Sequence, residues 1–380
     1  MNASNALYLV SAGKFITHLA CLQLVEHGLV TLDEPIYRLI PELEALPVIT
    51  ANGNYDGTKP DDVDNKPYVV RAQERPLTLR HMLTNSSGIP GGETDLILAY
   101  EKDHPPVKYP DGTSMIIQRF TLPLLFQPGE GWEYGHDVHF LQVVIERATG
   151  MKFVKYQQEQ IFDRLDMKAT AYLPLQKEGM KEKMMQVVQR TEDGGLKPAS
   201  EGAVAGIMCS VEDVQKLLGD LVSLEPRLVS RKMMDEMVFA PGLVSPSSSS
   251  YASSATALEA FRSQASDFAA APANIANHDA NPDVNYSVAG AMYVEKQTQI
   301  PKGSSLGQAR EKGKDEREVA TRLASPAGSL CWDGMPNVAW VANRDRGIAI
   351  FFGTQLLPEY DERVMSLMKE FFPLAWASVA

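Results

Sequence analysis

A serine and a lysine near the N-terminus have the spacing of a catalytic pair. Ser11 and Lys14 are three residues apart, and positions three apart share one face of a helix. A serine hydroxyl becomes a good nucleophile when a neighbouring base takes its proton, and a lysine held neutral by burial can serve as that base. The helix N-terminus adds free N–H groups and a positive field where an oxyanion would form.

The elements around this pair are those of an amphipathic helix. The apolar residues that follow at helical spacing are Phe15, Ile16, Leu19, Leu22 and Val25. Gly28 then gives a stop signal, so the pattern predicts a helix over residues 11–28 with Ser11 at its start.

The same Ser-x-x-Lys spacing occurs again at Ser366 and Lys369. A match this short is expected about once or twice by chance in a chain of this length. Ser366 lies inside a predicted helix rather than at its start, so it is interpreted as a solvent-exposed residue. The alternative for Ser11 is a helix-start serine with Lys14 on an exposed face. Local spacing alone leaves both interpretations of Ser11 open.

Composition narrows the function classes. The chain has 380 residues, of which 44% are apolar, enough for a large core or two joined domains. A formal charge of −12 with only short basic runs disfavours a nucleic-acid partner. The longest apolar run is far shorter than a membrane span, and residues 1–10 lack the features of a signal peptide. We therefore expect no membrane partner.

Cysteine and histidine usage gives two further expectations. Cys21, Cys209 and Cys331 are widely scattered, which is typical of reduced thiols and predicts a cytoplasmic location. His136 and His139 have metal-ligand spacing but no third ligand nearby, which favours ordinary surface or supporting residues over a metal site. No metal and no cofactor is expected.

Capping and turn signals outline the first half of the chain. Thr78 predicts the start of a short helix over 78–83, and Gly150 the end of an amphipathic helix over 137–149. A loop-rich, partly helical region is expected between these two helices. Ser210 opens a capping box and predicts a helix reaching about residue 223.

The C-terminal part has the signature of an antiparallel sheet. Residues 285–295 are predicted to form a strand, and residues 338–341 and 348–352 a buried hairpin. A final helix is expected from 359 to about 372.

The order of several motifs resembles the serine β-lactamase-like family, in its class C and esterase branch. The matching segments are residues 11–14 (SAGK), 26–35 (EHGLVTLDEP), 83–88 (LTNSSG), 128–136 (PGEGWEYGH), 202–210 (GAVAGIMCS), 328–334 (GSLCWDG) and 352–358 (FGTQLLP). The match spans nearly the whole chain in the right order. It is most similar to the fungal acyltransferases and hydrolases of natural-product pathways.

The resemblance implies roles for residues in these segments. Ser11 takes the nucleophile position, Lys14 the partner position and Tyr134 the Tyr of the family's Y-x-N motif. A tyrosine whose pKa is lowered by the lysine charge can relay a proton. Trp332, Asp333 and Gly334 fall on the third motif, which is K-T-G in lactamases and W-x-G in many esterases. The backbone N–H groups of Met335 and Ser11 would then form the oxyanion hole.

Two departures from the lactamase pattern concern the substrate. His136 replaces the Asn of Y-x-N, so an amide that contacts substrate is lost. Trp332 replaces the Lys of K-T-G, which supplies a cation for the carboxylate of a β-lactam or peptide. Burying a carboxylate without a partner is costly, whereas a Trp offers an apolar wall for a neutral acyl chain.

The resemblance also implies the architecture. It predicts an α+β, three-layer β-lactamase/transpeptidase-like fold, with an antiparallel sheet flanked by helices. Residues 1–29 and 166–380 would form the sheet domain, with mobile inserts near 245–283 and 296–320. Residues 30–165 would form a mostly helical region. Only ten residues precede Ser11, so the sheet domain is expected to be shortened at its N-terminus.

The leading hypothesis is a serine hydrolase or acyltransferase of secondary metabolism that works through an acyl-enzyme. Its partners would be a small-molecule acyl ester or thioester and, in one version, an acyl-carrier donor. One alternative is a catalytically silent or binding-only homologue. Another is a β-lactamase or DD-peptidase, disfavoured by the missing cation. The absence of a G-x-S-x-G motif disfavours an α/β-hydrolase.

Overall fold

The computed structural model describes residues 2–57, 65–105, 107–243, 255–265, 284–296 and 325–379. The chain divides into two compact units. Unit 1 comprises residues 1–23, 154–241 and 262–380, and unit 2 comprises residues 24–153 and 242–261. The domain boundaries and mobile inserts expected from the sequence stay predictions, and most of both inserts lies outside the described residues. Within the first of them, Ala255–Gln264 forms helix α9.

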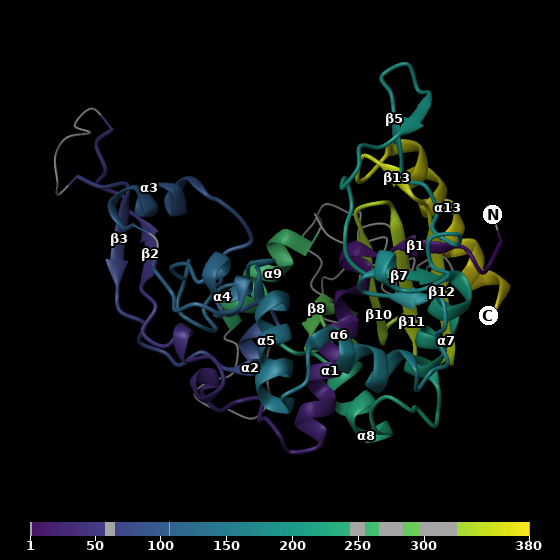
Figure 1. Cartoon of the computed structure of the whole chain (residues 1–380), viewed down its shortest axis with the longest axis horizontal. Helices are drawn as coiled ribbons and strands as arrows, with labels where there is room; N and C mark the ends of the chain where they lie inside the picture. The colour runs from purple at the N-terminus through teal and green to yellow at the C-terminus, as the bar shows by residue number, and fades with distance from the viewer. Residues whose placement is uncertain are drawn as a thin grey trace, which may run out of the picture. The chain divides into compact units, whose positions relative to one another are not determined.

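A five-stranded antiparallel sheet forms the centre of unit 1 (Figure 1). Its strands, in spatial order, are β12 (Ile348–Gly353), β11 (Val338–Asn343), β10 (Ser329–Gly334), β9 (Ala291–Val294) and β8 (Val284–Ser287). The hairpin predicted from the sequence is β11 and β12, paired from Val338↔Gly353 to Asn343↔Ile348. The β-branched and aromatic residues of these strands suit a pleated, buried surface.

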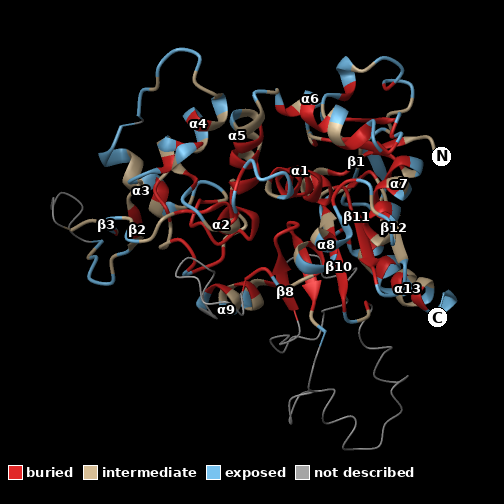
Figure 2. Cartoon of the chain, turned by 90° about the horizontal axis from the view of Figure 1, so that it is seen from below, coloured by how far each residue is buried: buried red, intermediate tan, exposed pale blue. Residues whose placement is uncertain are grey.

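Helices cover both faces of this sheet. Phe15 of α1 (Lys14–Glu26) contacts Trp340 of β11, with ring centroids 4.7 Å apart. Phe352 pairs in register with Ala339, the neighbour of Trp340, and therefore points to the opposite face. There it contacts Phe371 of α13 (Glu362–Ser378) at 5.4 Å. The sheet thus lies between two helical layers, as the predicted three-layer fold requires, and Figure 2 shows its central strands in the buried colour.

Smaller sheets and further helices complete unit 1. One sheet has the order β1–β7–β4, with β1 at Ala6–Tyr8, β7 at Met208–Ser210 and β4 at Thr170–Ala171. The other has the order β13–β5–β6, with β13 at Leu356–Leu357, β5 at Val188–Arg190 and β6 at Leu196–Pro198. The helices are α6 (Phe153–Gln157), which starts at the unit boundary, α7 (Val211–Val222) and α8 (Arg231–Met233). The Ser210 hydroxyl accepts a hydrogen bond from the Asp213 N–H at 3.2 Å, as the capping prediction required.

The regular elements of unit 2 are mainly helices, with one short hairpin. The hairpin pairs β2 (Val48–Ala51) with β3 (Tyr68–Arg71). The helices are α2 (Leu79–Leu83), α3 (Asp95–Asp103), α4 (Met115–Phe120) and α5 (Asp137–Thr149). Thr78 caps α2, and Gly150 ends α5 in the left-handed conformation at φ 71°, both as predicted.

Three elements differ from their predicted form. The strand expected over 285–295 is a hairpin, β8 and β9, which turns through Gly290 at φ 72°. The helix expected from residue 11 starts at Lys14, after a 3-10 turn over Val10–Gly13. The final helix continues past Pro373 to Ser378, because Trp376 extends the buried face that includes Phe372.

Candidate active site

Ser11 lies in the 3-10 turn η1 (Val10–Gly13), which leads directly into α1. The Lys14 N–H donates to the Ser11 carbonyl, so the two residues lie one turn apart. Both side chains are half-buried. Val10 has a φ of 48°, an unusual backbone state for a β-branched residue. Strained residues of this kind persist where the surrounding structure holds them, and they cluster at functional sites.

Backbone and ring contacts hold the Ser11 turn in unit 1. The Leu9 N–H donates to the Ile207 carbonyl at 3.0 Å. A Cβ added to Gly13 would lie 2.5 Å from Ile207 Cγ2, so only glycine fits against that side chain. The Trp340 indole N–H donates to the Ala12 carbonyl at 2.9 Å. Together these contacts fix the turn from two sides.

The third motif lies against the same turn. A Cβ added to Gly334 would be 2.2 Å from the Leu9 carbonyl oxygen and 2.9 Å from the Ala12 nitrogen. The end of β10 therefore packs on the backbone that carries Ser11, and unit 1 brings the first and third motifs together. Met335 begins the turn between β10 and β11, where its N–H lies outside the strand ladder.

The other two residues of the third motif differ in exposure. Asp333 is half-buried. Trp332 is only 1% exposed and packs edge-on against Tyr286 of β8, with ring centroids 5.5 Å apart. This packing anchors the strand next to the Ser11 turn. The substrate contact inferred for Trp332 from the resemblance stays a prediction.

His18 is a buried residue of this region that the sequence analysis did not single out. It lies one turn after Lys14 on α1, and its Nδ1 is 3.2 Å from the Val288 carbonyl oxygen. Gly290 packs against its ring, because an added Cβ would lie 2.5 Å from the imidazole. Burial lowers the pKa of His18 to about 4, with a smaller lowering from the Lys14 charge. The i, i+4 spacing from Lys14 was the available sequence signal.

Tyr134 and His136 lie in unit 2, on the loop that precedes α5. This loop is joined to residues 85–91 by backbone hydrogen bonds. The Glu133 N–H donates to the Asn85 carbonyl at 2.9 Å, and the His136 N–H donates to the Pro90 carbonyl at 3.1 Å. A Cβ at Gly135 would lie 2.1 Å from the Ile89 carbonyl oxygen, so the two segments are in close backbone contact.

Two carboxyl groups flank Tyr134 and His136 in the chain. Asp137 is 1% exposed, and no hydrogen bond of ordinary geometry reaches its carboxylate oxygens from the described residues. Burial therefore raises the pKa of Asp137 well above its ordinary range, against a weaker lowering by the Ser87 hydroxyl. Burial also raises the pKa of Glu133. Burial thus raises the pKa of both carboxyl groups on this loop.

The two histidines considered for a metal pack around an aromatic ring. Phe120 lies 4.1 Å from the His136 ring and 4.8 Å from the His139 ring, measured between centroids. Within the described ranges, no group of three or more His, Cys, Asp or Glu residues could hold a metal ion. The arrangement is that of a stacked aromatic cluster.

Unit 1 thus brings together Ser11, Lys14 and the third motif, while unit 2 holds Tyr134 and His136. The approach of Tyr134 to Ser11 stays a prediction. The second Ser-x-x-Lys match differs clearly from the first, because Ser366 and Lys369 are both exposed on the surface of α13. No helix in the described part of the chain has the length and apolar character to cross a membrane.

A family model described as beta-lactamase matches residues 1–367. The chain belongs to the β-lactamase family. It is 26% identical to the acyltransferase calJ of Penicillium decumbens, over 98% of this chain and 80% of that protein. It is 31% identical to the lovastatin esterase of Penicillium rubens, over 61% of this chain and 59% of that one. The β-lactamase-family member described here is therefore an enzyme of the acyltransferase and esterase type.

A solved structure supports the fold of this β-lactamase-family chain. Unliganded simvastatin synthase from Aspergillus terreus superposes with a TM-score of 0.74 at 23% identity, covering 100% of this chain and 85% of that one. This superposition confirms the β-lactamase/transpeptidase-like fold, and the sequence relatives confirm the resemblance to fungal acyltransferases. At 23% identity, the superposition is evidence for the fold only.

Proposed function

We propose that this enzyme is a serine acyltransferase or hydrolase of secondary metabolism that forms an acyl-enzyme on Ser11. Its substrate is a small-molecule ester or thioester. The main support for the proposal is the packing of Gly334 against the Leu9–Ala12 backbone, because this contact holds the third motif beside the Ser11 turn. The acyltransferase and esterase names of its relatives support this class of reaction.

Each proposed catalytic group has one step. Lys14 takes the Ser11 proton as the hydroxyl oxygen attacks the acyl carbonyl, and Tyr134 relays that proton to the leaving alkoxide or thiolate. The N–H groups of Ser11 and Met335 stabilise the oxyanion of the tetrahedral intermediate. Water or an acceptor hydroxyl then attacks the acyl carbon and loses its proton to the same base. The base passes this proton to the Ser11 oxygen as the bond between that oxygen and the acyl carbon breaks, which regenerates Ser11.

The substrate preference follows from the third motif. Trp332 stands where lactamases carry a Lys, so the motif supplies no cation for a substrate carboxylate. We expect hydrolysis of p-nitrophenyl acyl esters and little turnover of penicillins. Efficient cephalosporin hydrolysis with poor esterase activity would instead favour the β-lactamase alternative.

The decisive experiment is labelling with a serine-reactive phosphonate. Intact-mass analysis should show a single adduct, and peptide mapping should locate it on Ser11. Ser11→Ala should remove the adduct, whereas Ser366→Ala should leave it unchanged. A folded protein that gives no adduct and turns over no ester or thioester would support the catalytically silent alternative.

Two further parts of the proposal concern partner and location. If the enzyme is a transferase, the acyl donor is a thioester on an acyl carrier. Comparing the rate of acyl transfer from the carrier-bound thioester with the rate from a free thioester tests this. The cytoplasmic location rests on Cys21, Cys209 and Cys331, which are buried thiols rather than disulfides. Fractionation of the producing cells tests it.

A further inference from the structure

The strand that leads into the Ser11 turn is completed at its end by a side chain. β1 is an edge strand, and Tyr8 is its last residue. The Gln355 amide oxygen accepts a hydrogen bond from the Tyr8 N–H at 2.8 Å, and the Gln355 amide N–H donates to the Tyr8 carbonyl at 3.1 Å. In an antiparallel pair, two facing residues exchange these same two bonds. The Gln355 side chain therefore takes the place of a neighbouring strand.

Gln355 is itself held firmly. Its side chain belongs to a residue that is only 3% exposed, and the amide N–H also donates to the Thr354 carbonyl at 2.6 Å. Its backbone carbonyl accepts from the Val188 N–H of β5 at 2.8 Å. Both polar atoms of the side chain are thus hydrogen-bonded. Loss of the amide would leave the N–H and carbonyl of Tyr8 without these partners, which is unfavourable for buried backbone groups.

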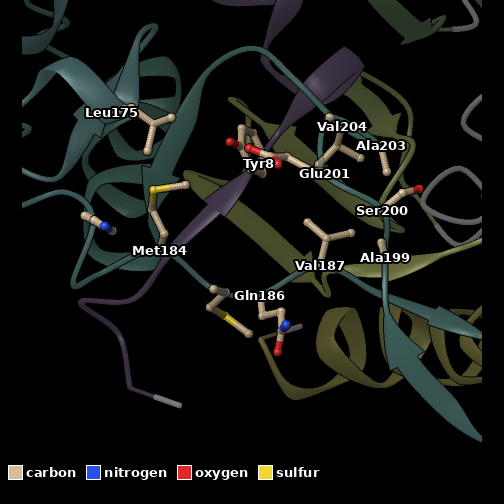
Figure 3. A pocket seen from close by; sticks show the side chains of 13 residues that line it. Tyr8, Leu175, Met184, Gln186, Val187, Ala199, Ser200, Glu201, Ala203 and Val204 are labelled. Atoms are coloured by element: carbon tan, nitrogen blue, oxygen red, sulfur yellow. The ribbon is translucent and has the colours of Figure 1, made fainter.

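The backbone of Tyr8 has more to hold than its side chain does. Tyr8 is half-buried, and its side chain borders a pocket of 380 Å³, where Figure 3 shows it near Glu201. One side of this residue therefore faces space rather than protein. Two residues later, Val10 has its unusual φ of 48°. A strained residue of this kind persists only where the surrounding backbone is fixed, so the bonds to Gln355 support the Ser11 turn.

The same segment also holds the turn between β10 and β11, which begins at Met335. The Thr354 hydroxyl donates to the Pro336 carbonyl at 2.6 Å. The side-chain amide of Asn337 donates to the Leu356 carbonyl at 2.8 Å. A stretch of three residues in the chain therefore holds both the strand end before Ser11 and the turn that follows the third motif.

We propose that Gln355 is a positioning residue for the oxyanion hole, supported by Thr354 on the Met335 side. The inference rests on the proposed function, in which the N–H groups of Ser11 and Met335 bind the oxyanion. Because one short segment holds the backbone next to both donors, it fixes the distance between them. Gln355 acts through the backbone of Tyr8 and not through contact with substrate. Donors that are already in place stabilise the tetrahedral intermediate without reorganisation.

Hydrolysis of p-nitrophenyl acetate separates a positioning role from a purely structural one. Gln355→Met keeps the length of the side chain and removes its amide. It should lower kcat by about tenfold to a hundredfold and leave KM within about twofold of wild type, because a displaced donor weakens stabilisation of the transition state more than binding of the ester. The rate of phosphonate labelling of Ser11 should fall with kcat.

Gln23→Met is the matched control. Gln23 is 1% exposed near the end of α1, and its amide donates to the carbonyls of Gln160 and Leu228 at 3.1 and 2.9 Å. Both glutamine variants should be less stable in urea unfolding, but Gln23→Met should keep the wild-type kcat and KM. An equal loss of kcat in the two variants would overturn the proposal, because any buried glutamine would then have the same effect.

Amide hydrogen exchange tests the contact without catalysis. In the Ser11→Ala protein, NMR should show that Gln355→Met speeds exchange of the Tyr8 N–H, which loses its acceptor. It should also speed exchange of the Ala12 N–H, whose bond to a carbonyl at 3.0 Å closes the Ser11 turn. Gln23→Met should leave both rates unchanged.

Thr354→Val is a second, milder variant on the other side of the segment. It has nearly the same shape as the threonine and removes the hydroxyl that bonds to Pro336. It should lower kcat by a smaller factor than Gln355→Met, again with little change in KM. It also provides the test if Gln355→Met does not fold, as judged by circular dichroism: a folded Thr354→Val with the kcat of wild type would then overturn the proposal.

The outcomes distinguish this inference from the proposed function. Ester hydrolysis through Ser11 with the kcat of wild type in folded Gln355→Met overturns the positioning role and leaves the Ser11 chemistry in place. Unchanged exchange at Ala12 overturns it as well, because the turn would then not depend on Gln355. A wild-type protein that forms no adduct and hydrolyses no ester rejects the proposed function and, with it, a role of Gln355 in catalysis.

Discussion

The low pKa of the buried His18 leads to a quantitative prediction of how the free energy of unfolding depends on pH. Its pKa falls from 6.5 to about 4 on folding, so the unfolded state binds the proton more tightly. The contribution of His18 is complete above pH 6.5 and is lost as the pH falls towards 4. The difference between the two pKa values corresponds to about 3 kcal/mol in the free energy of unfolding. About 2 kcal/mol of this stabilisation is lost when the pH falls from 7.5 to 5.

The charges and contacts around His18 make it a clean test. Lys14 is the charged group that acts on it, and it disfavours the imidazolium form. His18→Gln removes the titration and keeps a side-chain N–H able to donate to the Val288 carbonyl. The assay is urea unfolding at equilibrium, at pH 7.5 and pH 5, for wild type and His18→Gln.

Between pH 7.5 and 5, the free energy of unfolding of wild type should decrease by about 2 kcal/mol more than that of His18→Gln, because all other titrating groups are the same in the two proteins. The His18 ring signals in NMR should also show no titration above pH 5. If the two proteins lose the same free energy within about 0.5 kcal/mol, His18 is not held neutral by burial.

Other predictions address the catalytic turn and the loop of unit 2. Ser11→Ala should lower ester turnover by about a thousandfold or more, and Lys14→Ala by nearly as much. The double variant should lose no more activity than Ser11→Ala, since the two residues act as one unit. Ser366→Ala should match wild type in the same steady-state assay, and a large loss of activity in that variant would contradict the assignment of Ser11. Gly334→Ala should lower turnover strongly, because the added Cβ would lie 2.2 Å from the Leu9 carbonyl oxygen, whereas Gly219→Ala, with open space at its Cβ, should be harmless in activity and melting measurements. Because the pKa of Asp137 is raised, its contribution to the free energy of unfolding should fall as the pH rises, so wild type should become less stable relative to Asp137→Asn in urea unfolding between pH 5 and 8; an equal change in both proteins would show that the buried carboxyl has no such effect.

The sequence predicted those parts of the fold that depend on local signals. Thr78 and Ser210 marked helix starts through their capping side chains, and Gly150 marked a helix end. The hairpin of β11 and β12 followed from its apolar strands and short polar turn. Each of these signals acts over a few residues, which is why a single sequence contains it.

Features that depend on tertiary contacts were missed. The turn at Gly290 splits a continuous apolar stretch because the His18 ring, far away in the sequence, packs against it. Likewise, the 3-10 turn at Ser11 depends on Val10, whose positive φ is imposed by surrounding structure rather than by residue type. The motif spacing identified the candidate residues, but the contact of Gly334 with the Ser11 turn required the fold.

The contacts of the Ser11 turn have a consequence for laboratory evolution of this enzyme. The turn is held by glycine backbones and by the Trp340 indole N–H, so random substitution there is expected to yield mostly inactive clones. Residues 175–204, by contrast, carry mostly half-buried and exposed side chains, and exchanging these leaves the backbone hydrogen bonds of the segment in place. A library confined to that segment should therefore retain a high fraction of folded, reactive members.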